Sequence, residues 1–266
     1  LSLHDALPIS PRTNARPRGR NLVAIASGKG GVGKTLFAIS LSHALARAGR
    51  KVLLFDGDLG LANVDIQLGL MPKHDLGGVI AGRMSLNQAV LPFDDGGFDI
   101  ISGRSGSGSL VDLPVGRLQG LGDDLTLMAA NYDHVIIDLG AGVEKTVRAL
   151  TNNVGVILVV TTDEPTSLTD AYAFIKVTHM DQPDADIRVV VNMSNTPKEG
   201  ERTYNTLLKA CEGFLKFSPA LAGTVRRDDK VRSAIRSQTP LLMRYPNTDA
   251  AADIEAIATR LIKGSG

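Results

Sequence analysis

The chain has 266 residues, of which 43% are hydrophobic and 21% are charged, so it can bury the core of a folded globular protein. Its 29 Lys and Arg residues nearly balance its 28 Asp and Glu residues, which excludes a strongly basic nucleic-acid binder on overall charge. The single cysteine, Cys211, excludes an intramolecular disulfide and a cysteine-rich metal cluster within one molecule. It also predicts a cytoplasmic location, where thiols stay reduced.

The first twenty residues differ from the rest of the protein. Residues 1–20 contain three prolines, four arginines against one aspartate, and no apolar period, so we expect this segment to be disordered. The stretch from Leu3 to Ser10, LHDALPIS, resembles a translated sequencing adapter rather than native protein, and we attach no structural role to it. No apolar run reaches the roughly 18 residues of a membrane span, and no secretory signal is visible.

From Asn21 the hydrophobic pattern becomes regular. Residues 22–27, LVAIAS, form a continuous apolar run that is typical of a strand covered on both faces. After a glycine-rich turn, residues 35–48 show an apolar stripe at helical spacing. The pattern then predicts strands at 52–55, 98–102, 134–138, 155–161, 187–193 and 221–225, helices at 114–130, 143–152, 166–179, 201–216, 228–237 and 248–263, and a weakly helical stretch at 75–90.

Strands that alternate with helices predict parallel βαβ units with right-handed crossovers. We therefore predict one doubly wound α/β domain over residues 21–266, with a mostly parallel sheet and helices on both faces.

A phosphate-binding loop follows the first predicted strand and leads into the first predicted helix. Its residues are Gly28-Lys29-Gly30-Gly31-Val32-Gly33-Lys34-Thr35, which match the pattern G-x-x-x-x-G-K-[ST]. Glycines allow positive φ and let backbone N–H groups turn inward around a triphosphate. The N-terminus of the helix points its positive end at the same anion. We expect Lys34 to contact the β- and γ-phosphates and the Thr35 hydroxyl to bind Mg²⁺.

A second lysine, Lys29, makes the string KGGVGKT resemble the deviant Walker A ATPases of the MinD/ParA type, which are P-loop NTPases of the SIMIBI class. The resemblance implies ATP and ADP as ligands, Mg²⁺ as the metal, and an ATP-dependent homodimer in which Lys29 reaches the phosphates held by the partner subunit. A cation supplied in this way neutralises charge on the transferred phosphoryl group, as an arginine finger does. Taken alone, Lys29 has the alternative interpretation of a solvated loop charge.

Carboxylates follow two predicted strands, at the ends that face the ligand crevice of an open α/β sheet. The strand at 52–55 is followed by Asp56 and Asp58, and the resemblance implies that Asp58 orients the attacking water while Asp56 supports the Mg²⁺ shell. The alternative for Asp56 is that it caps a turn. The apolar residues 135–137 end in Asp138, the Walker B arrangement, which we expect to hold a Mg²⁺-bound water.

Two residues further along are candidates for contacting the nucleoside. Asn192 follows the apolar residues Val189–Val191, and the resemblance implies that it contacts adenine. Asp228 follows the predicted strand 221–225 and occupies the family's second base-side or ribose-side position. Arg226 stands where relatives often carry proline, and loop capping explains Asp228 equally well.

Two longer stretches indicate the branch of the family. They are DLGLANVDIQLGL at 58–70 and VVTTDEPTSLTDAYAFIK at 159–176, and they resemble the MinD-like regulators of flagellar number and placement, the FlhG/FleN/YlxH type. The resemblance runs from about Asn21 to Ile262. It implies a dimerisation switch whose partners are flagellar proteins, namely an SRP-type GTPase, a flagellar transcription regulator or a switch component. It also suggests that the exposed side of segment 163–179 meets these partners.

Two features of these relatives are missing or altered. Residues 1–20 contain no D-Q-A-x-x-L-R motif, which stimulates the GTPase partner, so the resemblance does not carry that activity over. MinD-like proteins also tend to end in a basic amphipathic helix that lies on anionic membrane. The helix at 248–263 carries Asp249, Asp253 and Glu255, which are unfavourable there, so we expect it to pack on the core. Peripheral association with the inner face of the membrane stays an open alternative.

Two other functions fit part of the sequence. A ParA-like ATPase that positions DNA or cargo would need a basic surface stripe and salt-sensitive binding, and the near-neutral charge argues against nucleic acid. A P-loop metabolic ligase would need an added substrate pocket, and Lys29 is unusual for one. A cluster-transfer ATPase would need a C-x-x-C motif to share a cluster between two subunits, and the sequence lacks it. We therefore place the regulatory ATPase first.

Overall fold

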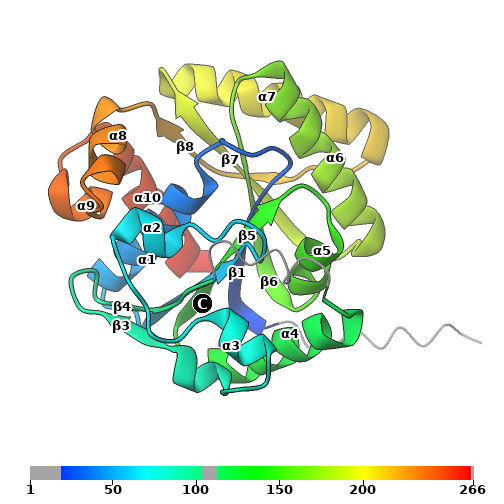
Figure 1. The fold of residues 1–266 in the computed structure, drawn as a ribbon. Coiled ribbons are helices and arrows are strands. Elements are labelled where there is room, and N and C mark those ends of the chain that lie inside the picture. The colour runs from blue at the N-terminus through cyan, green and yellow to red at the C-terminus, as the bar shows by residue number, and fades with distance from the viewer. Residues whose placement is uncertain (1–18, 104–112, 265–266) are drawn as a thin grey trace, which may run out of the picture.

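Apolar strands form the centre of the molecule. In the computed structural model, which describes residues 19–103 and 113–264, the strands make one eight-stranded sheet of order β3-β4-β2-β5-β1-β6-β7-β8 with helices on both faces (Figure 1). All neighbouring strands are parallel except β3 and β4, so the predicted doubly wound, mostly parallel α/β fold is confirmed. The strands are β1 (Gly19–Ser27), β2 (Val52–Gly57), β3 (Leu91–Phe93), β4 (Phe98–Ile101), β5 (His134–Ala141), β6 (Val154–Thr161), β7 (Asp186–Ser194) and β8 (Ala220–Arg226).

Two layers of helices cover the sheet, and each layer packs on its own cluster of buried apolar side chains. One layer contains α1 (Lys34–Arg47), α2 (Val64–Leu68), α8 (Asp229–Arg236), α9 (Leu241–Arg244) and α10 (Asp249–Gly264). The other contains α3 (Leu76–Ile80), the 3₁₀ helix η1 (Leu86–Ala89), α4 (Val115–Ala129), α5 (Lys145–Thr151), α6 (Pro165–Asp181) and α7 (Pro197–Leu215).

Successive side chains of each strand point to opposite faces of the sheet, and both faces are covered by helices. This explains why the strand sequences are continuously apolar. Along β1, Leu22, Ala24 and Ala26 belong to the cluster beneath α4 to α7, whereas Val23 and Ile25 belong to the cluster beneath α1 and α10. Successive side chains of a strand face opposite sides, so a sheet covered on both faces needs an apolar residue at every position. Each large aliphatic side chain buried in this way contributes about 2 kcal/mol.

The register of the central strands brings the predicted site residues together. In the parallel pairing of β2 with β5, Asp56 lies opposite Asp138, and in the pairing of β1 with β5, Ile25 lies opposite the same Asp138. The carboxyl ends of these three strands therefore meet at one edge of the sheet. The first helix begins at this edge, at Lys34, and ligands of open α/β sheets bind at such an edge.

The last helix, α10, packs on the core as the sequence predicts. Ile254 and Leu261 are buried in the cluster that also contains α1. Two of its acidic residues, Asp249 and Asp253, pair with Arg226 at 2.9 Å and 2.8 Å, so these carboxylates have a cationic partner within the protein. In the described parts of the protein, no helix has the length and apolar character needed to cross a membrane.

Several strand boundaries differ from the predictions. β1 begins at Gly19, which pairs with Val154, so the last two residues of the segment predicted to be disordered belong to the sheet. Residues 1–18 of that segment lie outside the described residues. Two other strands run further than predicted, to Gly57 and Ala141, because parallel pairing joins backbone groups and does not require an apolar side chain.

Short elements account for the other differences. The weakly helical stretch predicted at 75–90 is two elements, α3 and η1, because Gly82 adopts a positive φ of 71° directly after the first of them, as glycine commonly does after a helix. Three elements were not predicted: α2, β3 and α9, of five, three and four residues. Segments of this length are too short to show a hydrophobic period.

Candidate functional site

The carboxyl edge of the sheet opens into a cavity of about 1260 Å³. Its walls come from the loop between β1 and α1, the loops after β2 and β5, and the loops after β7 and β8. The predicted site residues line this cavity, with three exceptions that lie outside its lining: Gly28, Asp56 and Asp138.

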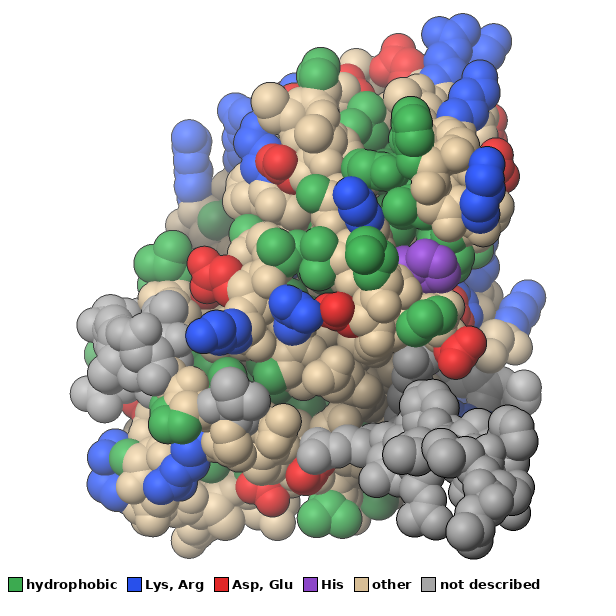
Figure 2. Space-filling model, turned by 90° about the vertical axis from the view of Figure 1, so that its right-hand side faces the viewer, with side chains coloured by type: hydrophobic (Ala, Val, Ile, Leu, Met, Phe, Trp, Pro, Cys, Tyr) green, Lys and Arg blue, Asp and Glu red, His purple; other side chains and the backbone are tan. Residues whose placement is uncertain are grey.

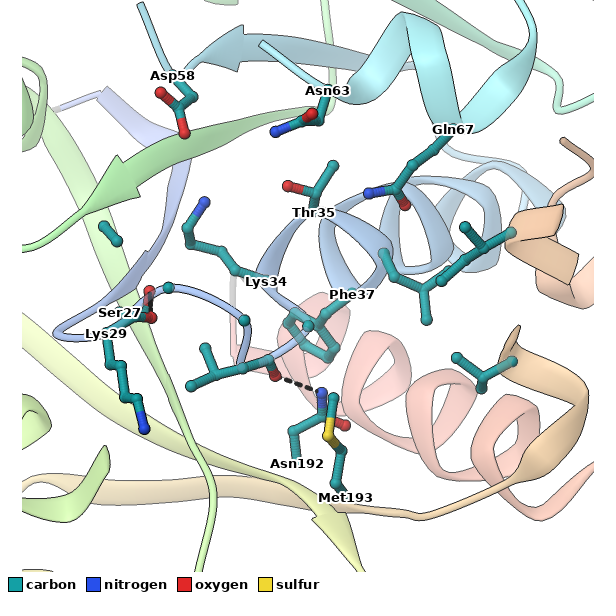
Figure 3. A pocket seen from close by; sticks show the side chains of 18 of the residues that line it. Ser27, Lys29, Lys34, Thr35, Phe37, Asp58, Asn63, Gln67, Asn192 and Met193 are labelled. Atoms are coloured by element: carbon teal, nitrogen blue, oxygen red, sulfur yellow. Dashed lines mark hydrogen bonds between the residues drawn. The ribbon is translucent and has the colours of Figure 1, made fainter. Parts of the chain in front are cut away.

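Figure 3 shows how the labelled side chains divide the cavity. Lys34 and Thr35 lie at its centre, at the start of α1. Asp58 lies on one side of them, on the loop after β2, and Asn192 lies on the opposite side, at the end of β7. Lys29 points away from the centre. The fold therefore brings together residues separated by more than 100 positions in the sequence.

Two glycines of the phosphate-binding loop are required for different reasons. A Cβ at Gly28 would stand 2.1 Å from the backbone carbonyl of Asp170 in α6, so glycine is needed there for the close approach of a neighbouring helix. Gly33 has a positive φ of 84°, and a Cβ on it would stand 2.5 Å from Nδ2 of Asn192. Both residues let the loop pass close to the side chains and backbone around it.

Lys34 is buried at the start of α1 and pairs with Asp138. Its Nζ lies 3.0 Å from Oδ1 of Asp138, and the two residues are 8% and 1% exposed. Burial raises the pKa of Asp138, while the charge of Lys34 and a hydrogen bond with Thr35 lower it. Removing one partner of such a pair would leave the other charge buried and uncompensated. The pair therefore holds the Lys34 ammonium group in place at the centre of the site.

Asp56 is fully buried at the end of β2 and organises the loop that follows. Its carboxylate accepts hydrogen bonds from the backbone N–H groups of Asp58, Asn63 and Val64, at 3.3, 3.1 and 3.2 Å. Burial first, and the charge of Asp138 second, raise the pKa of Asp56 to about 7, although the bonds from Val64 and Asp58 lower it. In this structure Asp56 thus behaves as the turn-capping alternative describes, and its support of a Mg²⁺ shell stays a prediction.

Asp58 lies on the loop after β2 and faces Gly140 at the end of β5. Its Oδ1 accepts a hydrogen bond from the backbone N–H of Leu61 at 2.9 Å, and a Cβ placed on Gly140 would stand 3.5 Å from the same oxygen. Asp58 and Lys34 point toward the same part of the cavity (Figure 3). A half-buried carboxylate in this position can accept a hydrogen bond from a water molecule in the cavity.

Lys29 pairs with a residue of the same molecule at the rim of the cavity. Its Nζ donates hydrogen bonds to Glu164 Oε2 at 2.8 Å and to Thr166 Oγ1 at 2.9 Å. The Lys29 and Glu164 side chains are 38% and 63% exposed, and the hydrogen bond from Lys29 lowers the pKa of Glu164. Exposed ion pairs are weak because water competes for both charges, so Lys29 can leave this partner at little cost.

The two predicted nucleoside contacts differ in how the structure uses them. Asn192 is buried, and its Nδ2 donates to the Val32 carbonyl at 2.8 Å (Figure 3), so it joins the end of β7 to the phosphate-binding loop. Asp228 lines the cavity but also caps α8, where its carboxylate accepts from the Lys230 N–H at 2.8 Å. The capping interpretation of Asp228 therefore describes its contact in this structure.

Glu164, Met193 and Gln67 are among the residues of the site that sequence reasoning missed. Glu164, which holds Lys29, lies within the stretch at 159–176, so that stretch contained a signal for it. Met193 lines the cavity with a φ of 59°, a conformation that methionine rarely adopts. Gln67 lines the cavity from α2, and a single polar residue in an unpredicted five-residue helix provides no signal in the sequence.

The oxygen donors at the carboxyl edge of the sheet, those of Thr35, Asp138 and Asp56, suit a magnesium ion. Thr35 and Asp138 are hydrogen-bonded to each other, and the charge of Asp138 raises the pKa of Asp56, a repulsion that a bound cation would relieve. Among residues 19–103 and 113–264, no group of three or more His, Cys, Asp or Glu residues is placed to hold a metal. Mg²⁺ is commonly bound through one or two carboxylates, with waters and phosphate oxygens completing its shell, and the donors here fit that mode.

Comparisons with known proteins agree with this geometry. A family model described as the CobQ/CobB/MinD/ParA nucleotide binding domain matches residues 23–241. Among solved structures, the septum site-determining protein MinD complexed with Mg-ADP from Pyrococcus horikoshii has a TM-score of 0.77 at 24% identity, over 92% of this protein and 97% of that one. A likeness at this level of identity shows the fold.

Two relatives are more similar in sequence. The antiactivator FleN of Pseudomonas aeruginosa is 38% identical over 240 residues, which are 90% of this protein and 85% of that one. The flagellum site-determining protein YlxH of Helicobacter pylori is 30% identical over 241 residues, which are 90% of this protein and 81% of that one. These similarities extend over nearly the whole described domain.

Proposed function

Since the chain belongs to the CobQ/CobB/MinD/ParA nucleotide-binding family and is a MinD/ParA-type ATPase, we propose that it is an ATP-dependent dimerisation switch that regulates flagellar number or placement through partner proteins. Its ligands are ATP and ADP with Mg²⁺. The flagellar part of the proposal is supported by the similarity to FleN and YlxH, at 38% and 30% identity.

The position of Lys29 is the observation that carries the dimerisation part. Lys34 already occupies the centre of the site and is held there by the buried Asp138. Lys29, near the start of the loop, instead lies at the rim and pairs with the exposed Glu164. A cation that lies at the rim and is weakly held can turn toward a triphosphate bound by a second copy of the protein. We assign Lys29 this role.

Each residue of the site then has a separate task in the hydrolysis of ATP. Thr35 and Asp138 would hold Mg²⁺, which neutralises phosphate charge when it is bound. Lys34 contacts the β- and γ-phosphates, and Asp58 orients a water molecule toward the γ-phosphorus. The water oxygen bonds to the γ-phosphorus and its proton passes to solvent, while the bond from the γ-phosphorus to the bridging oxygen breaks and its electron pair stays on ADP. The products are ADP, phosphate and a proton. Asp56 shapes the loop that carries Asp58.

Asn192 and Asp228 serve the nucleoside in this proposal. Asn192 holds the loop carbonyl of Val32, so its side chain lies directly beside the backbone that binds the phosphates. We place the adenine between Asn192 and the loop after β8, where Asp228 keeps α8 capped. The support for Asp228 is its position in the cavity lining, since its carboxylate is already hydrogen-bonded.

The proposed flagellar partner binds on α6 and α7. Segment 163–179 forms most of α6, and the ring of Tyr172 lies 6.5 Å from that of Phe214 at the end of α7. Phe214 and Met180 are 81% and 68% exposed, and Figure 2 shows hydrophobic side chains gathered on this face with charged ones around them. Apolar surface of this kind is typical of protein–protein interfaces, which supports a protein partner.

The switch is tested with Asp58→Ala, which removes the water-orienting carboxylate. We expect this variant to bind ATP with Mg²⁺, to hydrolyse it at least about 100-fold more slowly, and to elute as a dimer in size-exclusion chromatography with ATP. The matched control is Asp95→Ala, which removes an exposed carboxylate from the turn after β3. An Asp58→Ala protein that binds ATP yet stays monomeric would refute the dimerisation switch.

The flagellar role is tested in cells. Replacing the chromosomal gene with the Asp58→Ala variant fixes the protein in its ATP-bound form, so we expect flagellar number or position to change, as counted by electron microscopy. Cells carrying Asp95→Ala keep the wild-type pattern. Unchanged flagella in cells that make the Asp58→Ala protein at normal levels would contradict the flagellar assignment and leave the ATPase assignment intact.

A further inference from the structure

Met193 has a strained backbone where it lines the nucleotide cavity. Three described residues other than glycine have a positive φ, namely Met193, Lys216 and Gln238, and of these Met193 lines the cavity. Its φ of 59° brings its Cβ close to the backbone, whereas glycine adopts this conformation at no steric cost. Strain of this kind persists only where the surrounding structure holds it, and it clusters at ligand sites. The side chain of Met193 therefore calls for a role that glycine cannot fill.

A bulge at the end of β7 sets the direction of this side chain. The register of β7 with β8 shifts between Val191 and Ser194, where β7 has one residue more than its neighbour. Bulges beside active sites re-aim a side chain. The Cε of Met193 lies 3.2 Å from the position that a Cβ on Gly33 would take, and the side chain runs beside Asn192 in Figure 3. It is half-buried, so a ligand in the cavity can reach it.

The cavity is polar at one end and apolar at the other. Lys34, Thr35 and Asp58 line the end at the start of α1 (Figure 3). The end near β8 and α8 is lined by the aliphatic side chains of Val225, Val231, Ile235 and Ile254. A nucleotide has the same division, since its phosphates are charged and its base has two apolar ring faces. Met193 lies between the two ends, because it contacts Gly33 of the phosphate-binding loop and belongs to the strand beside β8.

We infer that Met193 is a positioning residue whose thioether packs against the ring face of the bound nucleotide's base. The inference rests on the proposed nucleotide site. A methionine sulfur is polarizable and makes favourable contacts with aromatic rings, so contact with the base offsets the strain that the backbone carries. The base is the end of the nucleotide remote from the γ-phosphorus, so this contact raises affinity and takes no part in the chemical step.

The inference is tested by calorimetric titration of the wild type and of Met193→Gly with ATP and with inorganic tripolyphosphate, both in the presence of Mg²⁺. Met193→Gly removes the thioether and keeps the backbone conformation. We expect its affinity for ATP to fall by about tenfold, the upper range for a contact between sulfur and an aromatic ring, and its affinity for tripolyphosphate to stay unchanged. An equal loss for both ligands, or no loss for either, overturns the inference and leaves the nucleotide site intact. A wild-type protein that binds neither ligand overturns both proposals.

Two further variants separate the side chain from the backbone. Lys216 has a similar φ of 56° at the end of α7 and is not part of the cavity lining, so Lys216→Gly is the matched control. Without nucleotide, both glycine variants should melt at or above the wild-type temperature, because backbone strain is relieved, and Lys216→Gly should keep the wild-type affinity for ATP. Met193→Leu keeps an apolar side chain and should bind ATP within about threefold of the wild type. An equal loss of ATP affinity in Lys216→Gly and Met193→Gly overturns the inference.

Steady-state kinetics give an independent readout. In Met193→Gly the KM for ATP should rise by about tenfold with kcat unchanged, as expected when an interaction is lost equally from the ground state and the transition state. A fall in kcat with KM unchanged would place Met193 with the reacting atoms and overturn the inference. If Met193→Gly does not fold, Met193→Asn takes its place with the same expectations, because asparagine tolerates this φ and lacks the thioether.

Discussion

The two lysines of the phosphate-binding loop form the same kind of ion pair in opposite surroundings. Lys34 and Asp138 are 3.0 Å apart, with side chains 9% and 1% exposed, whereas Lys29 and Glu164 are 2.8 Å apart, with side chains 38% and 63% exposed. The distances are similar, so burial is what distinguishes the inner pair (Lys34 and Asp138) from the outer pair (Lys29 and Glu164). A buried pair is costly to separate, and an exposed pair is not.

This difference suits the two tasks that we propose for the loop. Lys34 binds the nucleotide of its own subunit in this proposal, and a carboxylate that is buried from water fixes it in place. Lys29 acts on the nucleotide of a second subunit, and the exposed contact that holds it is one that it can leave.

The largest effect is expected from Lys34→Met, which breaks the inner pair. Nucleotide affinity should fall by at least about 100-fold, because charge-assisted contacts to phosphate are lost, and the free energy of unfolding should fall by about 3–5 kcal/mol, because Asp138 stays buried without its partner. Calorimetry with ATP and urea denaturation measure the two losses.

The double variant Lys34→Met/Asp138→Asn separates these losses. It removes the uncompensated charge as well, so most of the stability should return while nucleotide binding stays absent. If the single Lys34→Met variant is as stable as the wild type, the inner pair does not have the importance that its burial indicates.

A large effect confined to turnover is expected from Lys29→Ala. Its activity per subunit should fall by about 10³-fold at concentrations where dimers dominate, the magnitude associated with a cation supplied to the transition state. Its affinity for ATP as a monomer and its stability should stay within about twofold and about 0.5 kcal/mol of the wild type, because the pair it leaves is exposed. Measuring hydrolysis against protein concentration checks this, with Lys73→Ala, an exposed lysine away from the cavity, as the control. A rate per subunit that is independent of concentration in the wild type counts against action on a second subunit.

A smaller effect, on stability, is expected from pH, because Asp56 is buried near Asp138. The pKa of Asp56 is about 7 in the folded protein, against an ordinary value of 3.8. Between these two values the folded protein binds more protons than the unfolded state, so this group makes the free energy of unfolding decrease as pH rises from about 4 to 7.

The measurement is urea denaturation at several pH values in that window, without nucleotide or Mg²⁺. Asp56→Asn cannot titrate and should remove this part of the slope. If the free energy of unfolding depends on pH with the same slope in Asp56→Asn and in the wild type, then burial and the charge of Asp138 do not raise the pKa of Asp56.

The smallest effect is expected from Glu164→Gln, which weakens the outer pair. Stability and nucleotide affinity should be unchanged, because an exposed ion pair contributes little. The release of Lys29 should lower the protein concentration needed for the ATP-dependent dimer by less than about fivefold, as measured by analytical ultracentrifugation with ATP. Asp163→Asn, an adjacent exposed carboxylate, should leave that concentration unchanged. A raised concentration in the Glu164→Gln variant would show that Glu164 helps the dimer form.

Much of the fold could be predicted because its signals are local. The run LVAIAS predicts a strand buried on both faces, and β1 is buried on both faces. The apolar face of the last helix predicts core packing, and Ile254 and Leu261 pack in the core. The elements that escaped prediction, among them α2 and α9, are too short to repeat a pattern, and tertiary contacts such as that between Gln238 and Ile66 hold α2 in place.

The features of the site also divide into those that a local sequence pattern predicts and those that only the tertiary structure creates. The spacing of glycines and of Lys34 identifies a nucleotide-binding loop because the whole pattern lies within eight consecutive residues. An apolar strand that ends in Asp138 is likewise a local pattern, and it places a carboxylate at the crevice. The sequence does not show that Lys29 pairs with Glu164, that Asp56 is buried beside Asp138, or that the Met193 side chain lies against Gly33. These facts depend on residues far apart in the sequence, which only the packing of the sheet and its helices brings together, and on the burial that this packing creates.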